Sequence, residues 1–200
     1  MNTSWLPAHS VGRSAAVGTM LLLSACGGVS PADPQTPTTG RARLTATSDR
    51  TQGGRDADIG TCYKLRAPEG STLAFHAYAR GSQIYRWSGS AWTFVAPDAE
   101  LFADAGGRGK IGTHYAGPTW ESVSGSTVVG AVQERCTPNP SAIPWLLLGA
   151  QTAKGPGIFH GVIAIQRLNT VGGNAPTSPG TVIGEIEKVP YSAEYFFYRE

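Results

Sequence analysis

The sequence has little charge: Lys, Arg, Asp and Glu make up 15% of its 200 residues, where soluble domains usually have roughly 25%. A helix-compatible composition is lacking too, because glycine and proline together account for a fifth of the chain. So many helix breakers exclude a long coiled coil, and the absence of a Gly-X-Y period excludes collagen. The length and the 40% hydrophobic share leave one globular domain with appendages.

A basic surface is the next absence. Residues 58–200 contain 11 basic and 11 acidic side chains, so this part of the chain is formally neutral. The net charge of +2 therefore comes from the first 57 residues. Because nucleic-acid binding requires a basic face that displaces counterions from phosphates, we expect no nucleic-acid partner.

The motifs of common cofactor and nucleophile sites are also missing. No CxxC pair or Cys/His spacing indicates structural zinc, and no serine stands in a G-x-S-x-G elbow. Gly172-Gly173 is not a phosphate loop, since neither a lysine nor a helix start follows it. We therefore expect no cofactor and no metal, and the sequence favours a binding domain over an enzyme.

What the sequence does contain begins with an export signal. Residues 14–25 form a short apolar run that follows a lone Arg13 and ends in small residues, the layout of a secretory signal peptide. The run is too short to span a bilayer, which takes about 20 apolar residues. Residues 1–25 are therefore predicted to be a signal peptide.

The end of this run, Leu23-Ser24-Ala25-Cys26, resembles the lipobox of bacterial lipoproteins. The resemblance implies cleavage before Cys26 and acylation of that cysteine, for example by palmitate, which anchors the protein in a membrane. Each buried CH₂ of an acyl chain contributes about 0.8 kcal/mol. Because Gly27 and not Asp follows the cysteine, the resemblance implies the bacterial outer membrane, facing the periplasm. Plain secretion is the alternative.

Two regions follow the signal. Residues 26–57 are rich in Gly, Pro, Thr and Ser and nearly devoid of large apolar groups. They cannot bury enough surface to offset the entropy of ordering, so we predict a flexible tether. From residue 58 the pattern changes to short β-prone runs between turn residues. Residues 58–200 are therefore predicted to be a single all-β domain, an antiparallel sandwich or barrel.

Alternating runs place the strands of this domain. The expected strands cover residues 73–78, 83–87, 92–96, 111–115, 120–123, 127–133, 158–168, 182–187 and 191–198. Pro97 is expected to end its strand, whereas residues 195–198 are apolar on both faces, which fits a central strand. Residues 143–148 fit either a buried strand or a short helix with Pro144 in its first turn.

Cys62 and Cys136 remain if Cys26 is acylated. In an exported protein such a pair favours a disulfide. Closing its 74-residue loop would stabilise the fold by roughly 4 kcal/mol. Two buried free thiols are the alternative.

Four sequence blocks resemble a known family. They are GSQIY (81–85), HYAGPTWE (114–121), IPWLLL (143–148) and IQRLNTVGG (165–173), the last continued by 189–191 and 195–198. In this order they are similar to the bacterial and fungal domain-of-unknown-function family thirty-four fifty-five. The resemblance implies an exported β domain and brings no established activity. Members often have cysteines near position 87 and after the Gly-Gly-x-Ala-Pro block, where this chain has Trp87 and Thr177-Ser178-Pro179.

His114 and Glu121 are the candidate catalytic residues. If Gly117-Pro118 forms a turn, the flanking strands bring imidazole and carboxylate together as a general base with its orienting group, or as metal ligands. Ordinary hydrogen bonds within a hairpin are the alternative. His76 and His160 would complete a metal site only if their strands adjoined. An envelope hydrolase that uses His114 and Glu121 is therefore the enzymatic alternative.

Arg167 and Asn169 are expected on one face of a strand that ends at Gly172-Gly173. An arginine at the rim of a barrel clamps a carboxylate or phosphate through two parallel hydrogen bonds. A structural pairing of Arg167 with Glu121 or Glu194 is equally consistent with the sequence.

Large aromatic side chains either line a concave site for a sugar or hydrophobic ligand or fill the core. They are Tyr85, Trp87, Trp92, Tyr115, Trp120 and Trp145. We predict a lipid-anchored envelope protein whose β domain binds a small molecule or envelope component. The predicted ligand-binding residues are Tyr85, His114, Trp120, Glu121, Arg167 and Asn169. Besides the hydrolase, a structural envelope module without a pocket is the alternative.

Overall fold

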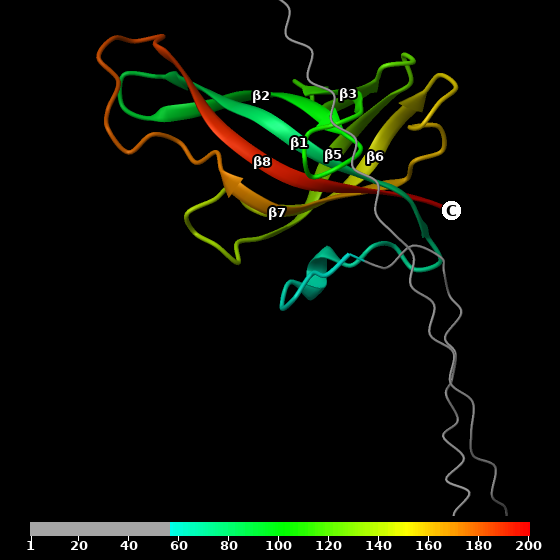
Figure 1. The fold of residues 1–200 in the computed structure, drawn as a ribbon. Coiled ribbons are helices and arrows are strands. Elements are labelled where there is room, and N and C mark those ends of the chain that lie inside the picture. The colour runs from blue at the N-terminus through cyan, green and yellow to red at the C-terminus, as the bar shows by residue number, and fades with distance from the viewer. Residues whose placement is uncertain (1–56) are drawn as a thin grey trace, which may run out of the picture. The chain divides into compact units, whose positions relative to one another are not determined.

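The structure is a computed structural model that describes residues 57–200. They form one antiparallel sheet of eight strands, which follow one another in chain order and close into a barrel (Figure 1). The strands are β1 (Thr72–Trp87), β2 (Trp92–Phe102), β3 (Lys110–Tyr115), β4 (Thr119–Ser122), β5 (Thr127–Cys136), β6 (Trp145–Lys154), β7 (Ala164–Gly172) and β8 (Ile186–Arg199). A short 3-10 helix, η1 (Tyr63–Leu65), precedes them. The predicted signal peptide, Cys26 and the tether up to residue 56 lie outside the described residues.

The predicted all-β antiparallel domain is confirmed, and the strand order makes it a barrel rather than a sandwich. Closure depends on the two long terminal strands, β1 and β8. They pair from Thr72 opposite Arg199 to Arg86 opposite Ile186, and Figure 1 shows them side by side along the barrel. Full closure removes the sheet edges that would otherwise carry unpaired backbone groups.

Two predicted strand limits are wrong near the start of the barrel. Residues 73–78 and 83–87 belong to one strand, because Arg80-Gly81-Ser82 pair with β2 on one side and β8 on the other. Pro97 does not end β2 but lies opposite Gln83 within it. Pairing of β2 with β3 begins only at Ala99, so Pro97 lies where β2 has one neighbour, which is where a sheet tolerates proline.

Two apolar runs for which the sequence predicts strands, residues 158–168 and 182–187, are partly loops in the structure. Strand β7 begins at Ala164 rather than residue 158, and Phe159 in the β6–β7 loop is completely buried in the barrel core. Residues 182–185 precede β8 as a loop, with Ile183 exposed. The ambiguous residues 143–148 are not helical, and from Trp145 onward they form the start of β6, so the strand alternative is confirmed there. A buried apolar segment therefore did not have to be a strand.

Aromatic rings fill the end of the barrel where β1 begins and β8 ends. The rings of Phe75 and Phe197 stack with centroids 4.5 Å apart. Phe159 adds a third ring, 5.1 Å from Phe197. The β6–β7 loop thus closes this end of the barrel from inside.

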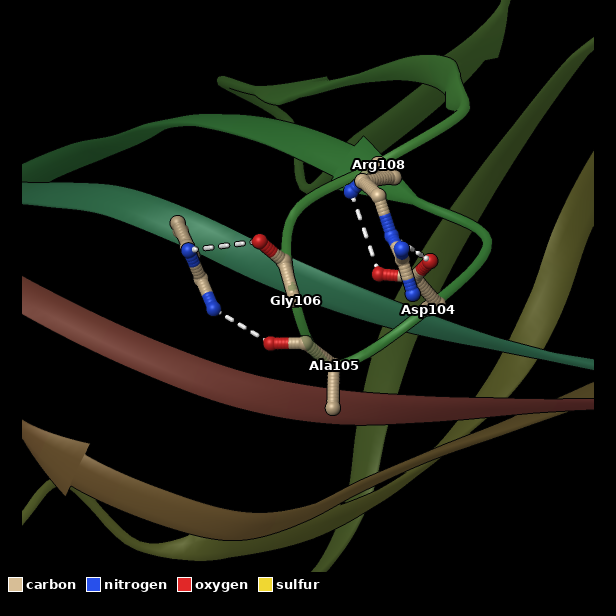
Figure 2. Close-up of polar contacts among 5 residues, drawn as sticks. Asp104, Ala105, Gly106 and Arg108 are labelled. Carbon is tan, nitrogen blue, oxygen red and sulfur yellow. Dashed lines mark hydrogen bonds and ion pairs between the residues drawn. The ribbon is translucent and has the colours of Figure 1, made fainter. Parts of the chain in front are cut away.

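The loop between β2 and β3 lies at the same end and is fixed by side chains (Figure 2). The carboxylate of Asp104 accepts hydrogen bonds from the backbone N–H and the Nε–H of Arg108, at 3.1 and 2.8 Å. Arg80 of β1 donates to the carbonyl oxygens of Ala105 and Gly106. The bonds of Asp104 fix the loop internally, and those of Arg80 attach it to β1.

A second apolar cluster lies outside the barrel, on the outer face of β6, β7 and β8. Residues 57–71, including η1, cover it, and Leu65 is completely buried there. Phe196 and Tyr198 belong to this outer cluster, whereas Tyr195 and Phe197 belong to the barrel core. The prediction of a strand that is apolar on both faces is therefore confirmed.

The covering segment is attached by a covalent and a polar contact. The predicted disulfide is confirmed: Cys62 is bonded to Cys136 at the end of β5, with Cα atoms 5.9 Å apart. Gln166 of β7 donates to the carbonyl oxygen of Leu65 and accepts from the Tyr198 hydroxyl at 2.7 Å. Within residues 57–200, no helix is long and apolar enough to cross a membrane.

Candidate functional site

Phe75, Phe159 and Phe197 form an aromatic plug at one end of the barrel. A cavity of about 430 Å³ opens at the opposite end. Each of the eight strands contributes to its lining. Leu146, Leu148 and Trp120 form apolar walls, and Phe94 and Val132 stand half exposed at the rim. The cavity is therefore a pocket within the barrel, and the core residues of the barrel form its floor.

The charged lining of this cavity is entirely cationic. Arg135 and Arg167 belong to it, whereas no aspartate or glutamate does among the described residues. Arg135 is exposed near the end of β5, and Arg167 of β7 is half buried. The cavity therefore offers positive charge without a compensating carboxylate.

Arg167 is held by backbone rather than by an acid. Its Nε and Nη2 groups donate to the carbonyl oxygen of Pro144 at 3.1 and 2.9 Å. The structural pairing considered from the sequence is wrong, because Glu121 accepts from the Tyr115 hydroxyl and Glu194 lies 2.9 Å from His76. Within residues 57–200, Arg167 forms no ion pair.

His114 of β3 lies at the inner wall of the cavity and is almost completely buried. Its Nδ1–H donates to the carbonyl oxygen of Thr119 at 2.8 Å, and its ring stacks on Trp120 at 4.4 Å. Burial lowers the pKa of His114 to about 3, although the hydrogen bond to Thr119 opposes this, and the charge of Arg167 lowers it further. The imidazole is therefore neutral at physiological pH.

The predicted pair of His114 and Glu121 is not formed. The hairpin exists, with Gly117 in a left-handed turn conformation at φ +115°. However, His114 lies opposite Trp120, whereas Glu121 lies opposite Thr113. Because neighbouring residues of a strand point to opposite faces, His114 faces the interior with Trp120 and Glu121 faces outward. The general-base pair is thus excluded by the register.

The three histidines of the alternative metal site do not meet. His76 stacks on Phe196 on the outer face of the barrel, His114 faces the interior, and His160 is exposed on the β6–β7 loop. No cluster of three potential metal ligands occurs in the described part of the chain.

Two of the predicted aromatic residues, Tyr85 and Trp120, line the cavity. The Tyr85 hydroxyl donates to the carbonyl oxygen of Gly173 at 2.7 Å. Gly173 has φ +79°, and a Cβ there would lie 2.9 Å from the Cβ of Tyr191, so this close approach requires glycine. The other aromatic candidates lie outside the lining: Trp87, Trp92, Tyr115 and Trp145.

Asn169 does not line the cavity that Arg167 lines, so the structure does not bring these two predicted residues together there. It is exposed and has φ +50°, a conformation that asparagine tolerates better than most residues. The register of β7 with β8 shifts between Leu168 and Val171. This bulge interrupts the alternation on which the prediction depended.

The comparisons place the chain in a family. The family model described as "Protein of unknown function (DUF3455)" matches residues 68–199, about two thirds of the chain. The chain belongs to this family. The match spans every strand of the barrel and begins after Cys62 and η1. The resemblance seen in the sequence is thus confirmed, while no curated protein and no solved structure matches the chain.

The DUF3455 barrel also contains polar lining residues that the sequence analysis missed, Gln83 and Tyr195. Both are at most 2% exposed, and within residues 57–200 the Nε2 group of Gln83, the hydroxyl of Tyr195 and the Nε1 group of Trp120 have no hydrogen-bond partner. Burial raises the pKa of Tyr195, so its hydroxyl stays protonated. One signal pointed to Gln83: it lies two residues before Tyr85, on the same face of its strand.

Proposed function

We propose that this DUF3455 protein is held in the bacterial cell envelope by a lipid anchor on Cys26 and binds a small molecule in its barrel. The cavity of about 430 Å³ is the observation that carries the proposal. It falls within the roughly 300–1,000 Å³ of typical small-molecule sites. An eight-stranded barrel is just wide enough either to be filled by side chains or to hold one small ligand.

The lining supports a binding site over a structural module. A module without a ligand gains nothing from buried polar groups that lack partners, and each such group costs about 1–3 kcal/mol. Gln83, Trp120 and Tyr195 carry three of them around one cavity. Apolar walls with a few polar groups at fixed positions are typical of ligand pockets. Since His114 and Glu121 face opposite sides, the hydrolase is not part of the proposal.

The ligand is testable without knowing its identity. The wild-type protein, released from envelopes under mild conditions, is expected to carry a small molecule detectable by native mass spectrometry. Leu146→Trp, which fills the cavity, should remove that mass. Val123→Trp is the matched control because Val123 is 72% exposed on the β4–β5 turn. A wild-type protein that carries no molecule, and that no small-molecule panel stabilises thermally, would contradict the binding function.

The lipid anchor has a separate test. Acyl chains on Cys26 are expected to retain the protein in membranes, so Cys26→Ser should move it to the soluble fraction of fractionated cells. Ser30→Ala, a change in the predicted tether, is the control and should stay with the membranes. Retention of the Cys26→Ser protein in the membrane fraction would defeat the anchor while leaving the binding proposal intact.

A further inference from the structure

The buried polar groups of the cavity that lack a hydrogen-bond partner within residues 57–200 are all hydrogen-bond donors. An indole Nε1–H and an amide Nε2–H only donate, and those of Trp120 and Gln83 have no partner. The Tyr195 hydroxyl lies beside Arg167 and Tyr191 but reaches hydrogen-bond geometry with neither. A ligand that satisfies these groups must bring acceptors.

Arg167 adds charge to this set of donors. A guanidinium has five N–H groups, and the Pro144 carbonyl takes bonds from the Nε and Nη2 atoms only. The remaining N–H groups suffice for a bidentate contact with one carboxylate. Because no acidic residue lines the cavity within residues 57–200, this part of the chain supplies no compensating negative charge there. The acceptor on the ligand is therefore expected to be anionic.

The rest of the lining limits the anion to a single charge. His114 is neutral, and Arg135 is exposed at the mouth, so one guanidinium provides the charge inside. A phosphate dianion or a dicarboxylate would leave a second negative charge against Leu146 and Leu148, where burying an unpaired charge is strongly unfavourable. Those apolar walls instead suit a ring or hydrocarbon chain.

We infer that the cavity binds an apolar monocarboxylate, with its carboxylate on Arg167 and its apolar part between Phe94, Trp120 and Leu148. This inference rests on the proposed binding function and names the ligand class for the same cavity. Gln83, Tyr195 and the Nε1–H of Trp120 supply neutral hydrogen bonds to the carboxylate. Arg135 at the rim attracts the anion toward the mouth.

The first test compares three probes of one shape. The full-length Cys26→Ser protein, purified without detergent, is titrated calorimetrically with 2-naphthoate, with neutral 2-naphthamide and with cationic 2-naphthylmethylamine. A contact with a charged group makes the carboxylate bind at least about tenfold more tightly than the other two. Decanoate against decan-1-ol repeats the comparison for a chain in place of a ring.

The second test removes the charge. Arg167→Met keeps the length of the side chain and should weaken 2-naphthoate binding about 10- to 100-fold, while the affinity for 2-naphthamide changes less than about twofold. Arg86→Met is the matched control, since Arg86 is exposed on the outside of β1. Its affinities should equal those of the Cys26→Ser parent.

Tyr195→Phe keeps the inference testable if Arg167→Met does not fold. It removes a buried hydroxyl that has no partner, so the melting temperature should stay equal or rise while 2-naphthoate binding weakens about fivefold. A residue with a purely structural role would show the opposite, a lower melting temperature with unchanged affinity.

The outcomes separate the two proposals. Equal affinity for the acid and the amide, or unchanged acid binding in both Arg167→Met and Tyr195→Phe, would overturn the inference and leave the binding function standing. If no probe binds, the inference also falls. The proposed function falls with it only if the wild-type protein carries no molecule in mass spectrometry either.

Discussion

The two ends of the barrel are built from the same eight strands but are filled in opposite ways. At one end, Phe75, Phe159 and Phe197 pack ring against ring, and a loop enters the barrel to complete the plug. At the other end a cavity of about 430 Å³ remains. The difference teaches that this fold concentrates its packing at one end and leaves the other for a ligand.

Polar groups follow the same division. At the closed end, the Ser126 hydroxyl bonds Ser122 and also accepts from the Phe159 backbone N–H. At the open end, Gln83, Trp120 and Tyr195 carry buried donors without partners. Unpaired buried donors reduce stability and increase affinity for a partner that satisfies them. Stability and binding are therefore expected to respond to different substitutions.

The largest expected contrast is between one phenylalanine from each end. Phe159→Ala removes a completely buried ring and should lower the free energy of unfolding by about 3–5 kcal/mol. Phe94→Ala, at a rim residue that is 51% exposed, should lower it by less than about 1 kcal/mol. Urea unfolding of the two variants checks this. Similar losses for both would break the division between the ends.

The disulfide is expected to act on stability alone. Replacing Cys62 and Cys136 together by alanine should lower the free energy of unfolding by about 2–4 kcal/mol, because the unfolded chain loses a constraint. Affinity for 2-naphthoate should stay the same, since the segment covers the outer face of the barrel. Chemical denaturation and calorimetry of one preparation measure both. A parallel loss of binding would mean that the outer layer shapes the cavity.

His114 at the cavity wall is expected to make the stability of the barrel depend on pH. The pKa of His114 is about 3 in the folded barrel, against 6.5 for an ordinary histidine, so below pH 6.5 the unfolded chain takes up the proton first. The contribution of neutral His114 to the free energy of unfolding is therefore fully present above pH 6.5. It is lost as the pH decreases toward 3, and the loss is about 2 kcal/mol at pH 5. His114→Phe should flatten this part of the pH–stability curve.

His160→Gln is the control for this measurement, because His160 is exposed on the β6–β7 loop. Its pH–stability curve should follow that of the wild type. If His114→Phe loses stability with acid as steeply as the wild type does, the buried neutral histidine is not the source of the pH dependence.

Local patterns in the sequence predicted much of this fold. Alternation and turn residues indicated the hairpin of β3 and β4, and the two apolar faces of residues 195–198 indicated a central strand. The disulfide was indicated by the two cysteines that remain when Cys26 is assigned to the lipobox. Each signal needs only neighbouring residues or a simple count. Local patterns failed where an apolar side chain is buried without belonging to a strand. Phe159, for example, is apolar because it fills the end of the barrel and not because it forms part of a strand.

The cavity depended on information that local patterns do not contain. His114 and Trp120 already lie opposite each other in the β3–β4 hairpin, but Arg167 of β7 joins them around one cavity only because the sheet closes into a barrel. The register of β3 with β4 places Glu121 on the outer face, and the pairing of β7 with β8 shifts around Asn169, which does not line the cavity. The spacing of Gln83 from Tyr85 indicates its place in the lining, whereas nothing in the sequence around Tyr195 distinguishes a lining residue from a core residue.

Indole N–H signals test binding at the open end most directly, because two tryptophans of the barrel are expected to respond in opposite ways. Trp120 lines the cavity, whereas Trp145 packs in the cluster outside the barrel. In ¹H–¹⁵N spectra of tryptophan-labelled protein titrated with 2-naphthoate, the Trp120 indole signal should shift in a saturable way and the Trp145 signal should stay in place. A shift confined to Trp145, or spectra that do not change at all, would contradict binding at the open end of the barrel.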